Sequence, residues 1–235
     1  MNGDKIMVNQ IVKNEIFIRG MIVGKYPHEE KTTIVVCSRS ANKEHSSYQY
    51  ITFFGDLKEK VDNMKICEKV VLTAYAWVFR DQETKLVNSD NIRLRGTSIE
   101  TSVEFSKRVF AAAGVPIYGL QMLDCMRFTF NGSIFSISKT KNGKISILLA
   151  VSDGERKGFS LIPLMYAGRG DEDEIEAILN RYSKGQVISV KGFISQKSVD
   201  VEPTEDSKFN SKYKNTYYIT TFLTGDTDAD FDEMI

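Results

Sequence analysis

The chain has 235 residues and a mass of 26.6 kDa, and its 31 basic residues balance its 31 acidic ones. Its longest aliphatic run covers only residues 147–151, whereas a membrane-spanning helix needs about 20 apolar residues. The N-terminus lacks a basic segment followed by an apolar run, so we expect no secretory signal. These features predict a globular protein of the cytoplasm.

The three cysteines and two histidines are too few and too scattered for a metal site. Cys37, Cys67 and Cys125 form no Cys-x-x-Cys pair, and His28 and His45 lie 17 residues apart. Zinc sites and disulfide scaffolds need closely spaced or evenly paired ligands. We therefore expect no metal, no cofactor and no disulfide.

The first half of the chain predicts five strands and a short helix. The strands cover residues 15–24, 31–37, 48–54, 68–80 and 85–95, and the helix covers 55–64, between the third and fourth strands. Three strands, a helix and two strands follow each other in an OB-fold, a five-stranded Greek-key barrel. Small residues at Ala74 and Ala76 in the fourth strand suit the narrow interior of such a barrel.

The second half repeats this order. We predict strands over 126–138, 144–151, 158–166, 185–198 and 213–224, with a helix over 171–182. Gly132 stands among alternating apolar residues as Gly20 does in the first half, which indicates a tandem duplication. The predicted fold is mostly β: tandem OB-fold five-stranded Greek-key barrels with short helices.

Four segments follow from this pattern. We expect a first OB-fold over 1–97, a helical linker over 98–125, a second OB-fold over 126–225 and an acidic tail over 226–235. The linker helix is predicted to cover 98–113, with Ser98 as its N-cap. The tail contains five acidic residues and no basic one, which leaves 31 basic and 26 acidic residues on the body. Such a tail could compete with a polyanion for a basic surface or serve as a handle for a partner.

No enzymatic motif is present, so we expect no catalytic residue. The sequence lacks a phosphate-binding G-x-x-x-x-G-K-[ST] loop, a G-x-S-x-G elbow and an H-E-x-x-H pair. The acidic run at 171–174 begins a predicted helix, where acids complement the helix dipole. A metal-dependent nuclease built on this run is the least favoured alternative.

Aromatic and basic side chains on the outer strand faces predict a surface for single-stranded nucleic acid. Aromatic rings stack on unpaired bases, and Lys and Arg contact the phosphates. The residues predicted to bind are Arg19, Lys25, Arg39, Lys43, Tyr48, Tyr50, Phe54, Tyr75, Trp77, Phe79, Arg80 and Lys85 in the first barrel, and Lys139, Lys141, Lys191 and Phe193 in the second. Arg93 and Arg95 are further bases nearby, and Phe135, Ile162 and Tyr166 are further outward apolar positions of the second barrel. The same aromatics could instead pack against the predicted helix, the other barrel or a second subunit.

Residues 14–80 resemble the bacterial single-stranded DNA-binding protein family. The segment NEIFIRGMI at 14–22 resembles the family's first strand, and Tyr48 and Phe54 match two base-stacking positions six residues apart. The family's Lys-Gly before the fourth strand, with a second glycine seven residues on, is matched at Lys184, Gly185 and Gly192. In the first copy these glycine positions hold Cys67 and Ala74.

The acidic end resembles the tip through which this family recruits replication enzymes. The residues that carry this resemblance are Asp228, Asp230, Phe231, Asp232, Glu233, Met234 and Ile235. The family usually has one barrel, a long linker and a Pro-Phe end, whereas this chain has two barrels and ends in Met-Ile. The resemblance implies binding of single-stranded DNA in replication, recombination or repair. The departure to two barrels in one chain predicts a monomer or a homodimer, and the compact design favours a phage or plasmid origin.

Two other functions stay open. An RNA-binding OB protein would show the same aromatic pattern, because stacking does not sense the sugar and discrimination depends on the 2′-hydroxyl. An assembly module would use the aromatics as a protein interface and would not bind DNA in a salt-dependent way.

Overall fold

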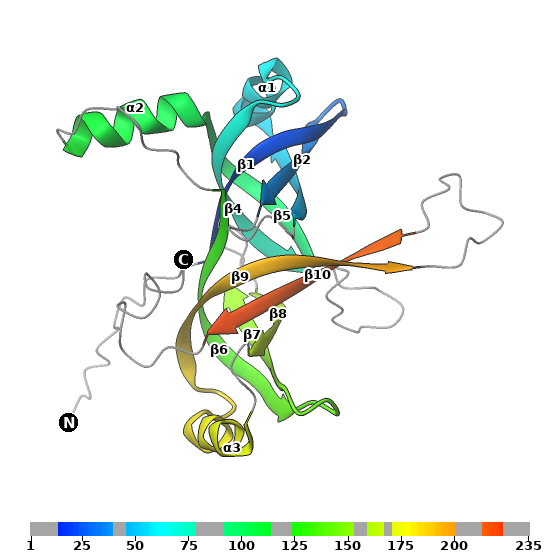
Figure 1. Cartoon of the computed structure of the whole chain (residues 1–235), viewed down its shortest axis with the longest axis vertical. Helices are drawn as coiled ribbons and strands as arrows, with labels where there is room; N and C mark the ends of the chain where they lie inside the picture. The colour runs from blue at the N-terminus through cyan, green and yellow to red at the C-terminus, as the bar shows by residue number, and fades with distance from the viewer. Residues whose placement is uncertain are drawn as a thin grey trace, which may run out of the picture.

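The computed structural model describes residues 14–39, 46–78, 92–113, 124–152, 159–166, 171–200 and 213–222, of which 195–200 and 213–222 are described by their backbone alone. The first half contains β1 (Asn14–Pro27), β2 (Lys31–Arg39), β3 (Ser46–Phe54), α1 (Gly55–Asn63), β4 (Lys69–Val78) and β5 (Ile92–Thr101). The second half contains α2 (Ser102–Ala113), β6 (Cys125–Lys139), β7 (Ile145–Ser152), β8 (Phe159–Tyr166), α3 (Glu172–Arg181), β9 (Val187–Asp200) and β10 (Tyr213–Phe222). Figure 1 shows the two halves stacked end to end, with the β9–β10 hairpin projecting to one side.

The ten described strands belong to one sheet that closes twice. The strand order is β2-β3-β5-β4-β1-β6-β7-β8-β10-β9, and the additional pairings β1–β2 and β6–β9 close a barrel in each half. The β3–β5 and β8–β10 pairs are parallel, and all other described pairs are antiparallel. Two five-stranded barrels with a helix between their third and fourth strands confirm the predicted tandem OB-fold.

Both barrels bend their first strand at the same glycine. A Cβ atom added to Gly20 would lie 2.4 Å from the carbonyl oxygen of Cys37, and one added to Gly132 would lie 2.4 Å from that of Ala150. A β-bulge follows two residues later in both β1 and β6. Glycine permits this close backbone approach, and the bulge increases the local bend that barrel closure requires.

The loops that lead into β4 and β9 also match. Cys67 has a φ of 69° and its N–H donates to the carbonyl of Ile22 at 2.8 Å. Gly185 has a φ of 87° and its N–H donates to the carbonyl of Ile134 at 2.7 Å. The chain thus reverses through a left-handed residue at the same place in both barrels, although only the second barrel has a glycine there.

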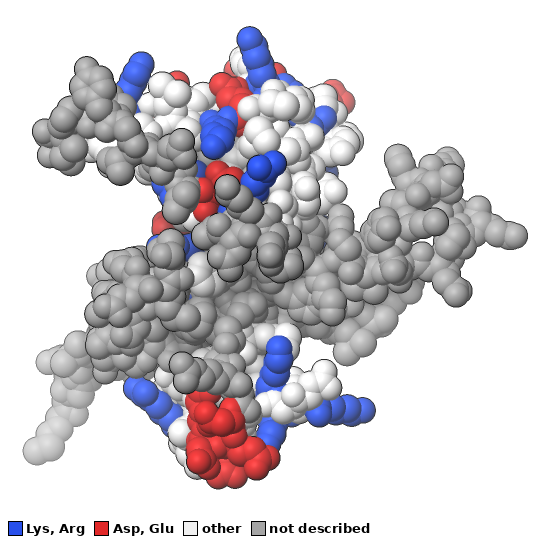
Figure 2. Space-filling view, in the orientation of Figure 1, with Lys and Arg blue, Asp and Glu red and all other residues white. Residues whose placement is uncertain are grey.

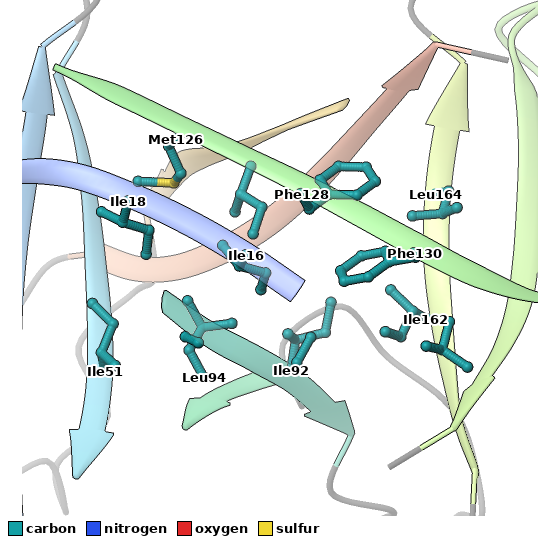
Figure 3. Close-up of a cluster of buried hydrophobic side chains, with 14 of the residues drawn as sticks. Ile16, Ile18, Ile51, Ile92, Leu94, Met126, Phe128, Phe130, Ile162 and Leu164 are labelled. Carbon is teal, nitrogen blue, oxygen red and sulfur yellow. The ribbon is translucent and has the colours of Figure 1, made fainter. Parts of the chain in front are cut away.

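One hydrophobic core runs through both barrels. Strands β1 and β6 pair antiparallel across the seam between the barrels, with Ile16 opposite Phe128. The rings of Phe128 and Phe130 stack with centroids 4.5 Å apart. Figure 3 shows these side chains from the second barrel beside Ile16 and Ile92 from the first. Because the barrels share buried apolar surface, their relative orientation is fixed by packing.

Polar contacts reinforce the seam. The Asn14 side-chain amide donates to the carbonyls of Ala76 at 2.8 Å and Ser152 at 3.1 Å, and its oxygen accepts from the N–H of Ala76 at 3.0 Å. The buried N–H of Val78 donates to the hydroxyl of Ser160 at 3.0 Å. The bonds from Asn14 to Ser152 and from Val78 to Ser160 join the two barrels, and they pair polar groups at strand ends that would otherwise be left without a partner.

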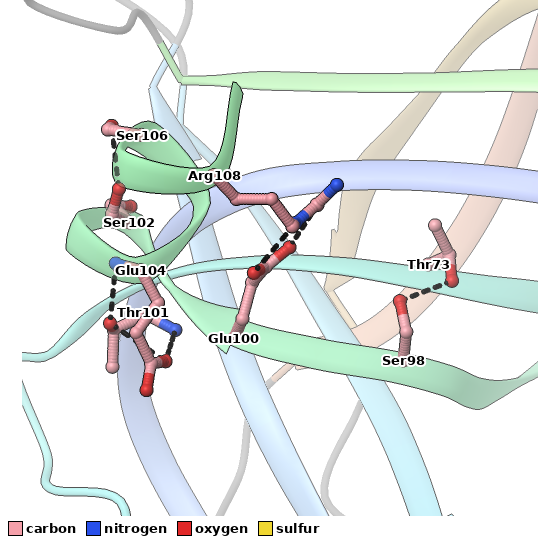
Figure 4. A network of polar contacts seen from close by, with 8 residues as sticks. All are labelled: Thr73, Ser98, Glu100, Thr101, Ser102, Glu104, Ser106 and Arg108. Carbon is pink, nitrogen blue, oxygen red and sulfur yellow. Dashed lines mark hydrogen bonds and ion pairs between the residues drawn. The ribbon is translucent and has the colours of Figure 1, made fainter. Parts of the chain in front are cut away.

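The linker helix begins later than predicted. Strand β5 continues to Thr101, and α2 starts at Ser102 rather than Ser98. The Thr101 hydroxyl accepts from the N–H of Glu104 at 3.2 Å, while the Glu104 carboxylate accepts from the N–H of Thr101 at 2.9 Å. This reciprocal pair is a capping box, which fixes the helix start. Figure 4 shows it beside the ion pair of Arg108 with Glu100.

Among the residues that the structure describes, no helix is both long and apolar enough to cross a membrane.

Candidate nucleic-acid interface

Strand β3 turns its aromatic residues outward. Gln49, Ile51 and Phe53 are fully buried, whereas Tyr48, Tyr50 and Phe54 keep 44%, 36% and 38% of their surface exposed. The predicted alternation in this strand is therefore confirmed. The inward residues fill the barrel core, so the three outward rings lie on one face of the sheet.

Strands β4 and β5 continue this outer face. Ala74 and Ala76 are buried, and the partly exposed Tyr75 and Trp77 alternate with them. The antiparallel register sets Tyr75 opposite Arg95 and Trp77 opposite Arg93. Cross-strand partners lie about 5 Å apart at their Cβ atoms. The sheet thus brings two arginines beside two aromatic rings.

A groove of about 480 Å³ lies across the outer face of β2, β3, β4 and β5. Its lining combines aromatic rings, cations and hydroxyls, and none of the lining residues is acidic. They are Lys31, Thr33, Tyr50, Thr52, Phe54, Trp77, Ile92, Arg93, Leu94 and Arg95. Such a groove offers flat apolar surface for unpaired bases and positive charge for phosphates.

Arg95, which lines this groove, lies close to two aromatic rings. Its guanidinium carbon lies 4.8 Å from the centroid of Phe54 and 6.0 Å from that of Tyr75. Cation–π attraction at these distances contributes roughly 0.5–1 kcal/mol when the pair is exposed. The contact orients both rings and the charge before any ligand arrives.

Two predicted residues of the first barrel serve elsewhere. The Lys25 amine donates to the carbonyls of Asp62 at 2.7 Å and Met64 at 2.8 Å, so it caps the C-terminal end of α1. Arg19 lies beside the thiol of Cys125 at the β1–β6 seam, where burial raises the pKa of that thiol. Neither residue lines the groove.

Other predicted residues lie away from the groove or outside the described part of the chain. Arg39 is exposed at the end of β2, where its backbone N–H donates to the carboxylate of Asp124 at 3.1 Å. The Lys139 amine lies 3.4 Å from a carboxylate oxygen of Glu172. Lys141 is in the β6–β7 turn, and Lys191 and Phe193 are on β9. Outside the described residues are Lys43, Phe79, Arg80, Lys85 and the tail residues 228 and 230–235.

Lys31 lines the groove but was missed among the predicted residues. The β2–β3 hairpin register places it directly opposite Phe54. The sequence shows that both residues flank short strands joined by one loop, but no local pattern specifies which residues of the two strands pair. The pairing could be read only with the register known.

The second barrel differs from the first in its charged surface. Figure 2 shows acidic side chains gathered over α3 at the end of this barrel, whereas both signs are mixed over the first. The Asp171 carboxylate caps α3 by accepting from the N–H of Glu174 at 2.7 Å. Tyr166 donates to Glu174 at 2.6 Å, and its partial burial together with this acidic neighbour raises the pKa of Tyr166 to about 12. Within the described residues, no group of three His, Cys, Asp or Glu could hold a metal ion.

One outward assignment in the second barrel was wrong. Ile162 is fully buried in the core, as is Leu164. Residues 161–165 form an almost continuous apolar run with no polar alternation, so the sequence did not show which set faces inward.

Known proteins resemble this chain in fold alone. No protein-family model matches it, and a search of the curated proteins found no match. The wild-type single-stranded DNA-binding protein from Thermus aquaticus matches with a TM-score of 0.55 at 10% identity, covering 92% of this chain and 95% of that one. A deletion mutant of the same protein gives a TM-score of 0.54 at 8% identity, covering 92% and 96%. The predicted resemblance to bacterial single-stranded DNA-binding proteins is thus confirmed at the level of the fold.

Proposed function

We propose that this protein binds single-stranded DNA without sequence preference, in the groove across β2, β3, β4 and β5 of the first barrel, and performs no covalent chemistry. The observation that carries the proposal is the lining of that groove, where three aromatic rings lie among three cations and no acid. The likeness of the whole fold to the Thermus aquaticus protein supports it.

Base stacking supplies the sequence-independent part of the affinity. Tyr50, Phe54 and Trp77 line one groove, and each stacked base contributes roughly 1–3 kcal/mol. Every base presents a flat π-face, so these rings accept any sequence. Arg95 already holds the ring of Phe54 in place, which reduces the entropy lost when a base stacks there.

Phosphate contacts supply the salt-dependent part. Lys31, Arg93 and Arg95 line the groove with no acidic neighbour in its lining. Each neutralised phosphate releases counterions, so the slope of log K against log salt changes by about −0.7 per contact on a single strand. Three contacts from these residues therefore give a slope of about −2.

The acidic tail is proposed to act in two ways. In the free protein it competes with DNA for the basic groove, and in the bound protein it is available to replication, recombination or repair enzymes. The reason is charge: residues 226–235 have five acids and no base, and they end a chain whose body is mildly basic. Deleting 226–235 is expected to tighten DNA binding at low salt, and equal affinities would remove the competition but not the recruitment of partners.

The test is a titration with dT and rU oligomers of equal length at two salt concentrations, followed by the fluorescence of Trp77, the single tryptophan. We expect quenching by dT, with the affinity falling as salt rises. The absence of binding in this titration and in an independent mobility assay would refute the proposal and favour an assembly module. Tighter binding of rU than of dT would replace DNA by RNA as the ligand.

A further inference from the structure

The strand registers match the two barrels position by position. Thr52 of β3 lies opposite Arg95 of β5, and Met165 of β8 lies opposite Thr220 of β10 in the same parallel arrangement. Three further features establish the equivalent positions in the remaining strands. They are the glycines at which the first strands bend, the bulges that follow them, and the left-handed residues before the fourth strands. The groove positions other than Phe54 therefore have identified counterparts in the second barrel, without any alignment of sequences, and the counterpart of Phe54 falls at residue 167, outside the described residues.

These counterparts have lost the chemistry of the groove. Pro163 is the counterpart of Tyr50. Each of them pairs with the residue of the second strand that comes directly after the bulge in the pairing of the first and second strands. Ser195 stands in the place of Trp77 and Thr220 in that of Arg95, from the matching β4–β5 and β9–β10 registers. Two stacking rings and a guanidinium are thus replaced by groups that can neither stack on a base nor neutralise a phosphate.

Three positions of the second barrel keep an aromatic ring or a cation. Lys144 precedes β7 as Lys31 begins β2, and Phe193 is the counterpart of Tyr75 on the fourth strand. Tyr218, which lies opposite Ser195, stands where the first barrel has Arg93. These residues provide isolated rings and a single cation, whereas the first barrel combines both in one groove.

The charge at the end of the third strand also makes the second barrel less suited than the first to bind phosphates. In the first barrel, α1 follows β3 directly and contains three acidic residues and two lysines. In the second barrel, residues 171–181 at the corresponding place contain five acidic residues and one arginine. Clustered negative charge repels a polyanion and raises the cost of bringing phosphates to this end of the barrel.

We infer that, within the described part of the chain, the single-strand site is the groove of the first barrel, and that the corresponding strand positions of the second barrel take no part in binding. The inference rests on the proposed function, since it concerns the same ligand. It assigns the second barrel a supporting role, in which its shared core holds the first barrel in place. It also removes Phe193 from the predicted binding surface.

Matched substitutions at equivalent positions test this division. Tyr75→Ala and Lys31→Ala change the first barrel, and Phe193→Ala and Lys144→Ala change the second at the same two positions. Tyr75 lies beside the groove, where its ring contacts Arg95 of the lining, and we expect Tyr75→Ala to weaken dT binding at least about fivefold. We expect Lys31→Ala to reduce the salt slope by about 0.7. Phe193→Ala is expected to change the dT affinity less than about twofold, and Lys144→Ala is expected to change the salt slope by less than about 0.2. Both limits are on the order of experimental error.

Stoichiometry provides a second readout on the unmodified chain. A dT oligomer that spans one OB barrel, on the order of 8–16 nucleotides, is expected to saturate at one per chain. Saturation at two oligomers per chain would overturn the inference while the proposed function stands. The same holds if Lys144→Ala reduces the salt slope as much as Lys31→Ala does. Failure of the unmodified chain to bind dT would refute the proposed function itself. Circular dichroism identifies a variant that fails to fold. If Phe193→Ala does not fold, Lys144→Ala still tests the second barrel, because Lys144 is exposed.

Discussion

Replacing Cys67 by glycine is expected to stabilise the protein. Cys67 has a φ of 69°, and a residue with a Cβ pays roughly 1–2 kcal/mol in the left-handed region. Glycine removes this strain but adds about 0.5–1 kcal/mol of chain entropy to the unfolded state. The difference is a gain of roughly 0.5–1 kcal/mol, which corresponds to a rise in Tm of about 1–4 °C for a chain of this length.

The second barrel offers the reverse change at the equivalent position. Gly185 has a φ of 87°, and a Cβ added there would meet no atom within 4 Å. Gly185→Ala therefore introduces the backbone strain without a steric clash, and we expect it to destabilise by roughly 1 kcal/mol.

Urea denaturation followed by circular dichroism and by Trp77 fluorescence measures both changes. Cys67→Ala is the matched control, because it removes the thiol but keeps a Cβ at the same φ. The control is expected to have the stability of the unmodified chain. If Cys67→Ala stabilises as much as Cys67→Gly, the thiol and not the backbone is responsible, and the reasoning from φ is refuted.

Three further changes have defined outcomes. Phe54→Ala removes a ring of the groove and should weaken dT binding about 5- to 150-fold in a fluorescence titration, while an unchanged affinity would contradict stacking at this position. Hydrogen bonds from Lys58 and Thr32 lower the pKa of Asp62, so its stabilisation is present above the unfolded-state pKa of about 4 and is lost as the pH falls below it. Asp62→Asn should cost up to about 1 kcal/mol at pH 7 in urea denaturation, and a deficit that persists at pH 2 would show that charge is not the cause. Gly20→Ala places a Cβ 2.4 Å from a carbonyl oxygen of β2 and should destabilise by roughly 1–3 kcal/mol, whereas a neutral result would mean that the bend can relax.

Local patterns in the sequence predicted most of the fold. Alternation identified β1, β3 and β4, because each has one face in the barrel core and one outside. The boundary between β5 and α2 was placed wrongly, although the sequence contained the signal. Thr101 and Glu104 have the spacing of a capping box, and this box, rather than a cap at Ser98, determines where the helix begins.

The candidate site was predicted in part, and the remainder depends on tertiary contacts. The outward positions of Tyr50 and Trp77 follow from strand alternation alone. The place of Lys31 follows from hairpin register, which no local pattern specifies. Lys25 was predicted to bind the ligand as a base near the outward aromatic residues, whereas its amine binds the end of a helix distant in sequence.

The pairing of β1 with β6 makes the contact between barrels independent of protein concentration. Separate barrels joined through the same strand edges would dissociate on dilution, because association depends on mass action. Here both strands belong to one polypeptide, so their encounter is intramolecular and its effective concentration is set by the intervening chain. The seam therefore forms in a single molecule, and a substitution at Ile16 need not be matched by one at Phe128, as the symmetry of a homodimer would require.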